Sequence, residues 1–309
     1  MHIRLGTAGL ITALTRRYFR KRISHNKEKI MNTFTSSIRI RDTSVGIVCP
    51  ACRRPIGIEP DTHCECGFKV KSIGGVPILR TLGQGEQVDY RAESSSLPVQ
   101  NSSNLQIKFV RQALESDGII LELGAGIDIC THPNLVKTDA FVYSSDLDYV
   151  VDAHAMPFED NTFDYVYSLA VFEHLHSPWV AAKEILRVLK PGGKVYVLTA
   201  FMQHVHGYPH HYFNMTTMGA ERIFADFEII SSGPSPHCPM DQLAVILLDV
   251  HQMSSNLGAD RSAKVLCHSI EDFCNALPNV QAELIKPEIN FEAWRRIAPG
   301  VEIVAMKPV

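Results

Sequence analysis

Four of the eight cysteines crowd into residues 49–66 and form two close pairs, Cys49 with Cys52 and Cys64 with Cys66. Eleven residues separate the pairs. Two short cysteine pairs on tight turns suit tetrahedral zinc, because each turn donates two thiolates from the same side. A unit of about forty residues buries little apolar surface, so a bound metal would supply its stability. The pattern predicts structural Zn²⁺ and a reducing compartment.

A glycine-rich turn follows the apolar run at residues 118–123 and is a second place where chemistry can occur. Glycines there let the backbone approach a cofactor that lies across the carboxyl ends of parallel strands. A G-x-G pair alone is weak evidence, since nicotinamide enzymes share it. Here an acid, Glu122, stands two residues before Gly124, and a third glycine is absent after Gly126. This context disfavours a nicotinamide oxidoreductase.

The turn ILELGAG and the later stretch VVDAHAMPFEDNTFDYVYSLAVFEHLHSPWVAAKEILRVLKPGGKVYV resemble class I methyltransferases of the Methyltransf_11 type, most closely over residues 118–200. The resemblance implies S-adenosyl-L-methionine as cofactor. The residues that it assigns to the cofactor are Glu122, Gly124, Gly126, Asp139, Asp152, Ala153, Ser168 and Leu169.

By this resemblance, Glu122 and the two glycines shape the floor under the methionine part. Asp139 accepts the ribose hydroxyls, and Asp152 accepts the adenine amino group beside the backbone of Ala153. Ser168 and Leu169 face the sulfonium and the substrate. Carboxylates suit vicinal diols and an exocyclic amine, and a cationic sulfonium tolerates acidic neighbours.

The sequence departs from this family on both sides of its second predicted strand. Only residues 124–134 separate the first strand from the second, and only thirteen positions separate Asp139 from Asp152, so the first two crossover helices are expected to be short or missing. Asp146 and Asp148 remain alternatives to Asp139 as the ribose ligand. A trimmed site also leaves open a methyltransferase fold that no longer methylates.

The stretch CPACRR…HCECGFKVKSIGGVPIL resembles the Trm112-like zinc-ribbon modules found before methyltransferase domains. That family usually has two residues between the cysteines of its second pair, a spacing that would put His63 opposite Cys66. The fourth ligand is therefore Cys64 or His63. The alternative is a ribbon that has lost its metal and survives as a packed β-unit.

The histidine-rich segment 201–212 (FMQHVHGYPHHY) follows a predicted strand and so faces the cleft. It resembles bacterial methyltransferases with an F-M-Q…P-H-x-Y motif from glycan and natural-product pathways. This implies an O or N nucleophile on a small-molecule or glycan-type acceptor. The candidate catalytic residues are His210, Tyr212 and His174.

Three interpretations of this loop remain. A histidine acts as general base or positions the acceptor, since its pKa suits neutral pH. Alternatively, the rings only form hydrogen bonds in a rigid loop, and the pair at 173–174 orients the next helix. The third interpretation is a metal held by His204, His206, His210 and His211.

Apolar runs that alternate with helical patterns predict an α/β fold, a Rossmann-like sheet of seven strands. The predicted strands are 118–123, 135–139, 149–152, 163–169, 194–200, 227–231 and 301–306. Ser177 and Pro178 are expected to start a helix that Pro191-Gly192-Gly193 ends. The predicted regions are a basic disordered leader (1–40), a zinc-ribbon-like module (41–82), a linker (83–105) and a methyltransferase domain (106–309) with a helical insertion (239–285).

Composition narrows the functional classes. A net charge of -3 gives no overall nucleic-acid footprint, and no stretch has the length of a membrane span. We therefore expect a cytoplasmic enzyme with no stable nucleic-acid partner; the sequence does not predict an oligomeric state. Two rival functions are an inactive scaffold with a methyltransferase fold and an RNA or protein methyltransferase. The second would use the leader, whose first thirty residues hold eight Arg and Lys.

Overall fold

In the computed structural model the described residues are 45–82, 88, 103–126, 130–143, 146–203, 205–206, 210–237 and 298–309. The predicted leader and the predicted helical insertion lie outside these residues, as does most of the predicted linker. The last residues of that linker fall within a short 3-10 helix, η1 (Ser103–Gln106).

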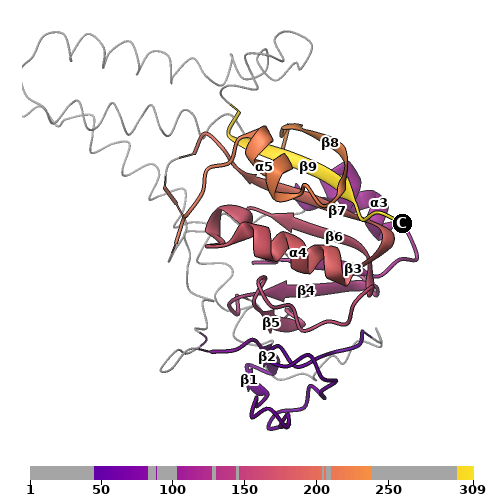
Figure 1. Ribbon diagram of the computed structural model, residues 1–309, viewed down its shortest axis with the longest axis vertical. Coiled ribbons are helices and arrows are strands. Elements are labelled where there is room, and N and C mark those ends of the chain that lie inside the picture. The colour runs from indigo at the N-terminus through magenta and orange to yellow at the C-terminus, as the bar shows by residue number, and fades with distance from the viewer. Residues whose placement is uncertain are drawn as a thin grey trace, which may run out of the picture. The chain divides into compact units, whose positions relative to one another are not determined.

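One mixed sheet organises the described residues. Its nine strands are β1 (Lys71–Ile73), β2 (Val76–Leu79), β3 (Ile120–Leu123), β4 (Leu135–Asp139), β5 (Tyr149–Val151), β6 (Phe163–Leu169), β7 (Leu189–Ala200), β8 (Glu228–Pro234) and β9 (Gly300–Met306). Their order is β1-β2-β5-β4-β3-β6-β7-β9-β8 (Figure 1). The seven predicted strands correspond to β3–β9. The prediction of a seven-stranded sheet is wrong in number, because β1 and β2 of the cysteine-rich unit extend it beyond β5.

The strands from β2 to β7 run parallel to one another in the sheet. Strand β9 pairs antiparallel with both β7 and β8. The carboxyl ends of β2 to β7 therefore meet along one edge, where open parallel sheets bind ligands. We call this the carboxyl edge; its strands end at Leu79, Leu123, Asp139, Val151, Leu169 and Ala200.

Helices cover both faces of the sheet. Alternate residues of a strand point to opposite faces, so each strand contributes side chains to the packing of both layers of helices. They are α3 (Lys108–Leu114), α4 (Pro178–Val188) and α5 (Thr217–Ile223), with a 3-10 turn η2 (Phe172–His174). Helices α4 and α5 share a buried cluster with Leu121 and Val166, and α4 lies across the front of the sheet in Figure 1. Helix α3 packs with Ile120 and Tyr167 on the other face. Among the helices of the described residues, none is both long and apolar enough to cross a bilayer.

Helix α4 begins at Pro178, whose fixed φ suits a first helical position. Ser177 occupies the N-cap position, as predicted, but its hydroxyl makes no capping bond to the helix. The Ser177 hydroxyl bonds instead to His176 Nδ1 at 2.9 Å. The helix therefore starts without the side-chain cap that the sequence suggested.

The end of α4 also differs from the prediction. The helix stops at Val188, and β7 begins at the next residue instead of after Pro191-Gly192-Gly193. Gly192 has φ +76 within this early part of β7, a conformation that favours glycine. The pairing of β6 with β7 becomes regular only from Tyr165 and Lys194 onward, which is where the sequence predicted the strand.

Loops follow β3, β4 and β5 at the carboxyl edge. Within the described residues of the connections 124–134 and 140–148 no helix occurs. The described parts of these loops therefore place side chains and backbone groups, and no helix terminus, at the carboxyl ends of β3 and β4.

The cysteine-rich unit (45–82) joins the sheet directly. Strand β2 pairs in parallel with β5, with Ile78 opposite Val150. Further contact comes from the Val48 N–H, which donates to the Pro157 carbonyl at 3.0 Å. This unit therefore contributes its own strand end, and the residue that follows it, to the carboxyl edge.

An ion network fastens the same unit to α4. Glu184 accepts bonds from Arg53 Nη2 at 2.7 Å and from Arg187 Nη2 at 2.9 Å. It also accepts the Met156 N–H at 2.8 Å. Burial alone would raise the pKa of Glu184, but the bonds and charges of Arg187 and Arg53 outweigh it and hold that pKa below its ordinary value. The carboxylate is thus charged at neutral pH and links three segments.

Candidate functional site

Close packing shapes the glycine turn after β3. Gly124 has φ +84, and a Cβ there would clash with Val171 Cγ2, so no side chain fits. The N–H groups of Gly124 and Ala125 both donate to the Thr138 carbonyl, at 2.8 and 2.9 Å. Gly126, at φ +55, has no heavy atom of the described residues within 4 Å of a built Cβ. In this part of the chain the turn is therefore tight at its first glycine and open at its second, which suits the close approach of a ligand to the backbone.

Asp139 ends β4 beside this turn and is 9% exposed. Its Oδ2 accepts the Gly126 N–H at 2.9 Å, and its Oδ1 accepts the Phe141 N–H at 3.0 Å. A carboxylate offers about four acceptor sites, so these bonds are compatible with ligand hydroxyls. Asp139, the predicted ribose ligand, therefore lies at the carboxyl edge and also holds the glycine turn in place.

The alternative ribose ligands are less well placed. Asp148 precedes β5 and accepts the N–H of Lys137, in the middle of β4, at 2.8 Å. It thus lies at the amino end of β5, away from the carboxyl edge. Asp146 is exposed in the same connection. The positions favour Asp139 among the three acids.

Asp152 follows β5 directly and is tied to His154. Its Oδ1 accepts the His154 N–H at 2.9 Å and lies 2.7 Å from His154 Nδ1. Burial raises the pKa of Asp152, but the bonds from His154 and the nearby charge of Arg80 more than offset it, so the pKa lies below its ordinary value. Ala153 beside it is 7% exposed. Asp152 is therefore an ionised acceptor at the carboxyl edge.

Arg80 is the residue at this edge that sequence reasoning missed. It comes immediately after β2, from the cysteine-rich unit, and its Nη1 donates to the Ala140 carbonyl at 3.1 Å. Burial lowers the pKa of Arg80, and the charge of Asp152 opposes that shift. The only sequence signal is an arginine just after a short apolar strand, and its partner strand lies seventy residues further on.

The predicted residues of β3 and β6 are more deeply buried. Glu122 is 3% exposed within β3. Ser168 is fully buried, and its hydroxyl donates to the Leu123 carbonyl at 3.0 Å, which joins β6 to β3. Leu169 is half-buried, and the next residue, Ala170, is exposed with φ +54. A positive φ at a non-glycine residue stores strain, as often occurs at functional sites.

The three predicted catalytic residues come together beyond the ends of β6 and β7. His174 Nδ1 lies 2.6 Å from the carbonyl oxygen of His210. The Tyr212 N–H donates to the Glu173 carbonyl at 2.7 Å, and the rings of His210 and Tyr212 are 5.2 Å apart. Glu173 itself is fully buried, and its Oε2 accepts the Thr199 hydroxyl at 3.0 Å.

The four histidines that the sequence offers as metal ligands do not form one group among the described residues. His204 lies outside the described residues. The rings of His206 and His211 are 4.6 Å apart, whereas His210 is exposed and faces Tyr212. Ligand atoms of Glu173, His174 and His206 lie within 4.8 Å of one another. The group of possible metal ligands among the described residues therefore differs from the four histidines of the loop, and only His206 belongs to both.

The four clustered cysteines converge as the zinc prediction requires. The Sγ atoms of Cys49 and Cys66 are 3.5 Å apart, and those of Cys52 and Cys64 are 3.4 Å apart. Tetrahedral zinc with bonds of about 2.3 Å places its sulfurs about 3.8 Å apart. His63 instead lies in a β-bridge with Lys69. The donor set therefore fits zinc, with Cys64 in the fourth position.

The first cysteine turn has the bonding of a metal knuckle. Burial raises the pKa of the Cys49 thiol to about 12, while the N–H groups of Ala51 and Cys52 bond to its sulfur and lower the pKa. Cys66 and Cys64 raise it further. A buried thiolate of this kind needs a bound cation to stay ionised at neutral pH.

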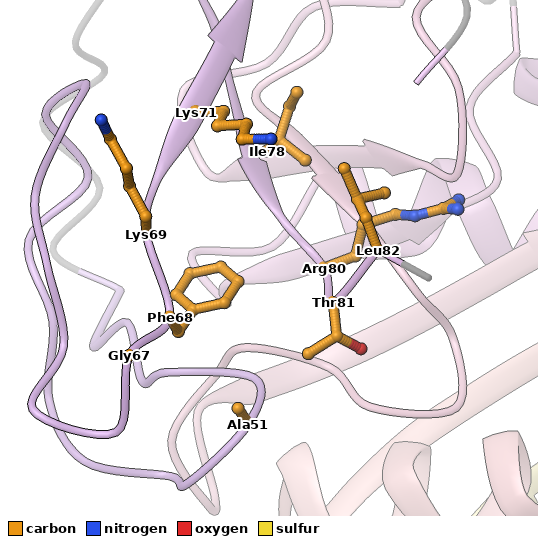
Figure 2. A pocket seen from close by; sticks show the side chains of 9 residues that line it. All are labelled: Ala51, Gly67, Phe68, Lys69, Lys71, Ile78, Arg80, Thr81 and Leu82. Carbon is orange, nitrogen blue, oxygen red and sulfur yellow. The ribbon is translucent and has the colours of Figure 1, made fainter. Parts of the chain in front are cut away.

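An open pocket of about 280 Å³ lies on the cysteine-rich unit. Figure 2 shows Phe68 at its centre, with Lys69 and Lys71 on one side and the Arg80 side chain extending away from them. None of its lining residues belongs to β3–β7. The cysteine-rich unit alone thus lines this pocket, and Arg80 is the lining residue whose charge also acts on Asp152.

The part of the chain that is similar to a known family contains β3–β6, whose ends form most of the carboxyl edge. Residues 108–197 match the family model described as a methyltransferase domain. The sterol 24-C-methyltransferase of Schizosaccharomyces pombe is 48% identical over 60 residues, 19% of this chain and 14% of the relative. A ubiquinone/menaquinone biosynthesis C-methyltransferase of Roseobacter denitrificans is 31% identical over 99 residues, 31% of this chain and 38% of the relative. The chain thus spans less than half the length of these two relatives.

Among solved structures, the [4+2]-cyclase SpnF is similar over 69% of this chain and 85% of its own, with a TM-score of 0.41 and 18% identity. A complex of the Haloferax volcanii Trm112 methyltransferase activator and its partner methyltransferase has a TM-score of 0.37 and 16% identity, over 67% of this chain and 94% of that one.

Proposed function

We propose that this protein is an S-adenosylmethionine-dependent methyltransferase of class I. The observation that carries the proposal is the meeting of two ionisable acids with an open glycine turn at one edge of a parallel sheet. Asp139 ends β4, and Asp152 directly follows the adjacent β5. The N–H of Gly126 donates to Asp139, and no described residue fills the space that a Cβ of Gly126 would enter. All three belong to the segment that matches the methyltransferase domain.

The cofactor supplies a methyl group on a cationic sulfonium. Asp139 would accept the ribose hydroxyls, and Asp152 with the backbone of Ala153 would bind the adenine amino group. Gly124 and Gly126 would let the methionine part approach the backbone. Because the pKa of Asp152 is held low, its carboxylate stays charged at neutral pH without assistance from the ligand. Methyl transfer then needs alignment and exclusion of water rather than a covalent side-chain intermediate.

The acceptor is proposed to be a small-molecule or glycan-type compound that offers an oxygen or nitrogen nucleophile. His210 and Tyr212 are exposed beyond the ends of β6 and β7, and His174 is bonded to the backbone of His210. Imidazole can take a proton from a hydroxyl or amine near neutral pH. The names of the two relatives above, both C-methyltransferases, support carbon as the second candidate acceptor atom.

The cysteine-rich unit is proposed to carry one structural Zn²⁺ held by Cys49, Cys52, Cys64 and Cys66, in the manner of Trm112-like ribbons. Four protein ligands leave no open position, so the ion would not contact substrate. Its effect on catalysis would be indirect, because the same unit supplies β2 and Arg80 to the carboxyl edge.

Methyl transfer tests the proposal. The full chain is incubated with S-adenosylmethionine labelled in its methyl group and with acceptors that carry hydroxyl, amine or activated carbon groups. We expect label on oxygen or nitrogen, and its loss in Asp152→Ala but not in Asp117→Ala, an exposed residue that precedes β3 at the opposite end of the strands. Label on carbon alone would correct the acceptor, and failure of both transfer and cofactor binding would contradict the function.

A further inference from the structure

Glu173 is a carboxylate that the proposed methyl transfer does not use. It is fully buried at the start of the segment that follows β6. One oxygen, Oε2, is held by the Thr199 hydroxyl, whereas Oε1 is buried and has no hydrogen-bond partner among the described residues. A buried carboxylate oxygen without a donor is costly, so its position calls for a ligand.

His174 is held in the state that a metal ligand needs. Its Nδ1 lies 2.6 Å from the His210 carbonyl, which only accepts, so Nδ1 carries the proton and donates. In a neutral ring the lone pair is then on Nε2. Metal-bound histidines usually donate their other ring N–H to a carbonyl or carboxylate in this way.

His206 faces the same point from the loop after β7. Its Nε2 is 3.9 Å from Glu173 Oε1, beyond hydrogen-bond distance, and its ring centroid is 5.4 Å from that of His174. In a tetrahedral site with bonds of about 2.1 Å, two ligand atoms lie about 3.4 Å apart. Small side-chain rotations would therefore bring Glu173 and His206 onto one ion.

A second layer of bonds holds His206 in place. The His206 N–H donates to His211 Nδ1 at 3.3 Å, and His211 Nε2 lies 2.9 Å from Asn214 Oδ1. Asn214 in turn donates its amide to the Gln203 carbonyl at 2.8 Å. His211 thus orients the loop that carries His206. Because both of its ring nitrogens are engaged in these bonds, His211 does not belong to the proposed set of metal ligands.

We propose that Glu173, His174 and His206 bind one divalent transition-metal ion whose open positions take an oxygen of the acceptor. Two imidazoles and one carboxylate suit zinc and iron, and three protein ligands leave room for a further ligand. The ion would lie at the β6–β7 side of the carboxyl edge, beside His210 and Tyr212. The role of the acceptor rests on the proposed function, whereas metal binding does not.

Such an ion would favour acceptors whose nucleophile is a hydroxyl. A coordinated hydroxyl loses its proton more easily, because the positive charge stabilises the oxyanion. The proposal therefore narrows the acceptor class to compounds with a hydroxyl group, alone or beside a second oxygen that can share the ion.

Metal content of the full chain tests the proposal directly. The protein is stripped with a chelator, loaded with Zn²⁺, dialysed and analysed for metal. We expect Glu173→Gln and His206→Ala each to hold one ion per chain fewer than the wild type. Loading with Co²⁺ should show an absorption band without thiolate character that is lost in both variants. His237→Ala, an exposed histidine outside the cluster, should match the wild type.

Two results would overturn the proposal: wild-type metal content in both variants, or a wild type whose bound metal depends on the cysteines alone. If Glu173→Gln fails to fold, His206→Ala decides, since its side chain is partly exposed. Binding of S-adenosylhomocysteine is measured separately on Zn²⁺-loaded His206→Ala, which keeps all four cysteines. Absence of that binding in both this variant and the wild type would contradict the proposed function and leave the metal result intact.

Discussion

The two halves of the carboxyl edge hold their acids in different ways. At the ends of β4 and β5, Asp139 and Asp152 accept backbone N–H groups at 2.9–3.0 Å. Beyond β6, Glu173 has one oxygen bonded to Thr199 and the other without a hydrogen-bond partner in the described part of the chain. The first half is therefore fixed before any ligand arrives, whereas the second has a polar group still to be satisfied.

The turns that follow β3 and β6 also differ in backbone strain. After β3, glycine adopts the positive φ at 124 and 126, where it costs little. After β6, Ala170 adopts φ +54, which costs an L-residue about 1–2 kcal/mol. The half assigned to the cofactor is thus relaxed, and strain is concentrated in the half assigned to the acceptor.

The largest expected effect concerns the zinc proposed to stabilise the cysteine-rich unit, whose strands extend the sheet beyond β5. Structural zinc contributes about 10–16 kcal/mol of apparent binding free energy in small zinc-finger peptides. We expect Cys64→Ser to lose bound zinc, lower the melting temperature and weaken S-adenosylhomocysteine binding through β2. Metal analysis and calorimetry measure these effects, with Cys130→Ser as the control. Equal zinc in Cys64→Ser and the wild type would refute the four-cysteine site.

The next effect separates the two glycines of the first turn. Gly124→Ala should destabilise the fold by roughly 2–5 kcal/mol, because a positive φ and the contact with Val171 add together. Gly126→Ala should cost only about 1–2 kcal/mol while weakening cofactor binding. Chemical denaturation and binding titrations compare them. If both variants lose equal stability, the open cradle at Gly126 does not exist.

Glu184 tests the link between the cysteine-rich unit and α4. Glu184→Gln should cost about 2–4 kcal/mol, since it leaves Arg53 and Arg187 without their shared carboxylate. The folded-state pKa of Glu184 is depressed, so its contribution is present above the unfolded value of about 4.3 and is lost as pH falls through the folded pKa. Urea unfolding at pH 7 and at acidic pH measures this loss.

The exposed Asp160, which also bonds Arg187, supplies the control for that series. Asp160→Asn should cost under about 1 kcal/mol, as exposed ion pairs do. A pH-independent difference between Glu184→Gln and the wild type would show that the carboxylate charge is not what links the segments.

Substitution of Arg80 tests whether the cysteine-rich unit contributes to the proposed cofactor site at the ends of β4 and β5. Arg80→Gln removes the charge beside Asp152 and one donor to the Ala140 carbonyl. We expect affinity for S-adenosylhomocysteine to fall about tenfold, which is about 1.4 kcal/mol. Arg54→Gln, on the exposed side of the same unit, should leave affinity unchanged. Equal affinity in all three proteins would remove Arg80 from the site.

The smallest effect compares two helix starts. The Thr216 hydroxyl accepts the Gly219 N–H at 3.1 Å, so Thr216→Ala should cost about 1 kcal/mol. The Ser177 hydroxyl makes no such bond, and Ser177→Ala should change stability by less than about 0.5 kcal/mol. Thermal unfolding of both variants measures the difference, and the reverse order would contradict the assigned caps.

The sequence predicted the first half better than the second for a physical reason. Strands β3, β4 and β5 are short apolar runs, and Gly124, Asp139 and Asp152 stand at or next to their ends, so local pattern and topology place them at one edge. The pairing of β2 with β5 joins segments seventy residues apart, and periodicity carries no information on such contacts. Arg80 was missed for that reason.

The acceptor half depends on distant side chains. Glu173 and His206 are thirty-three positions apart, and only the packing of the loop after β7 brings them within 3.9 Å. The loop sequence suggested four histidines as a group because they are close in the chain. Hydrogen bonds of His211 and of the His210 backbone, which composition does not encode, separate them into different roles.

Calorimetric titration with S-adenosylmethionine and S-adenosylhomocysteine tests the central claim most directly, in the wild type, Asp152→Ala and the exposed-site control Asp117→Ala. The cofactor site at β3–β5 predicts a dissociation constant on the order of micromolar for wild type and control, and its loss in Asp152→Ala. Equal binding in all three proteins would place the cofactor elsewhere. No binding by the zinc-loaded wild type would contradict the methyltransferase function itself.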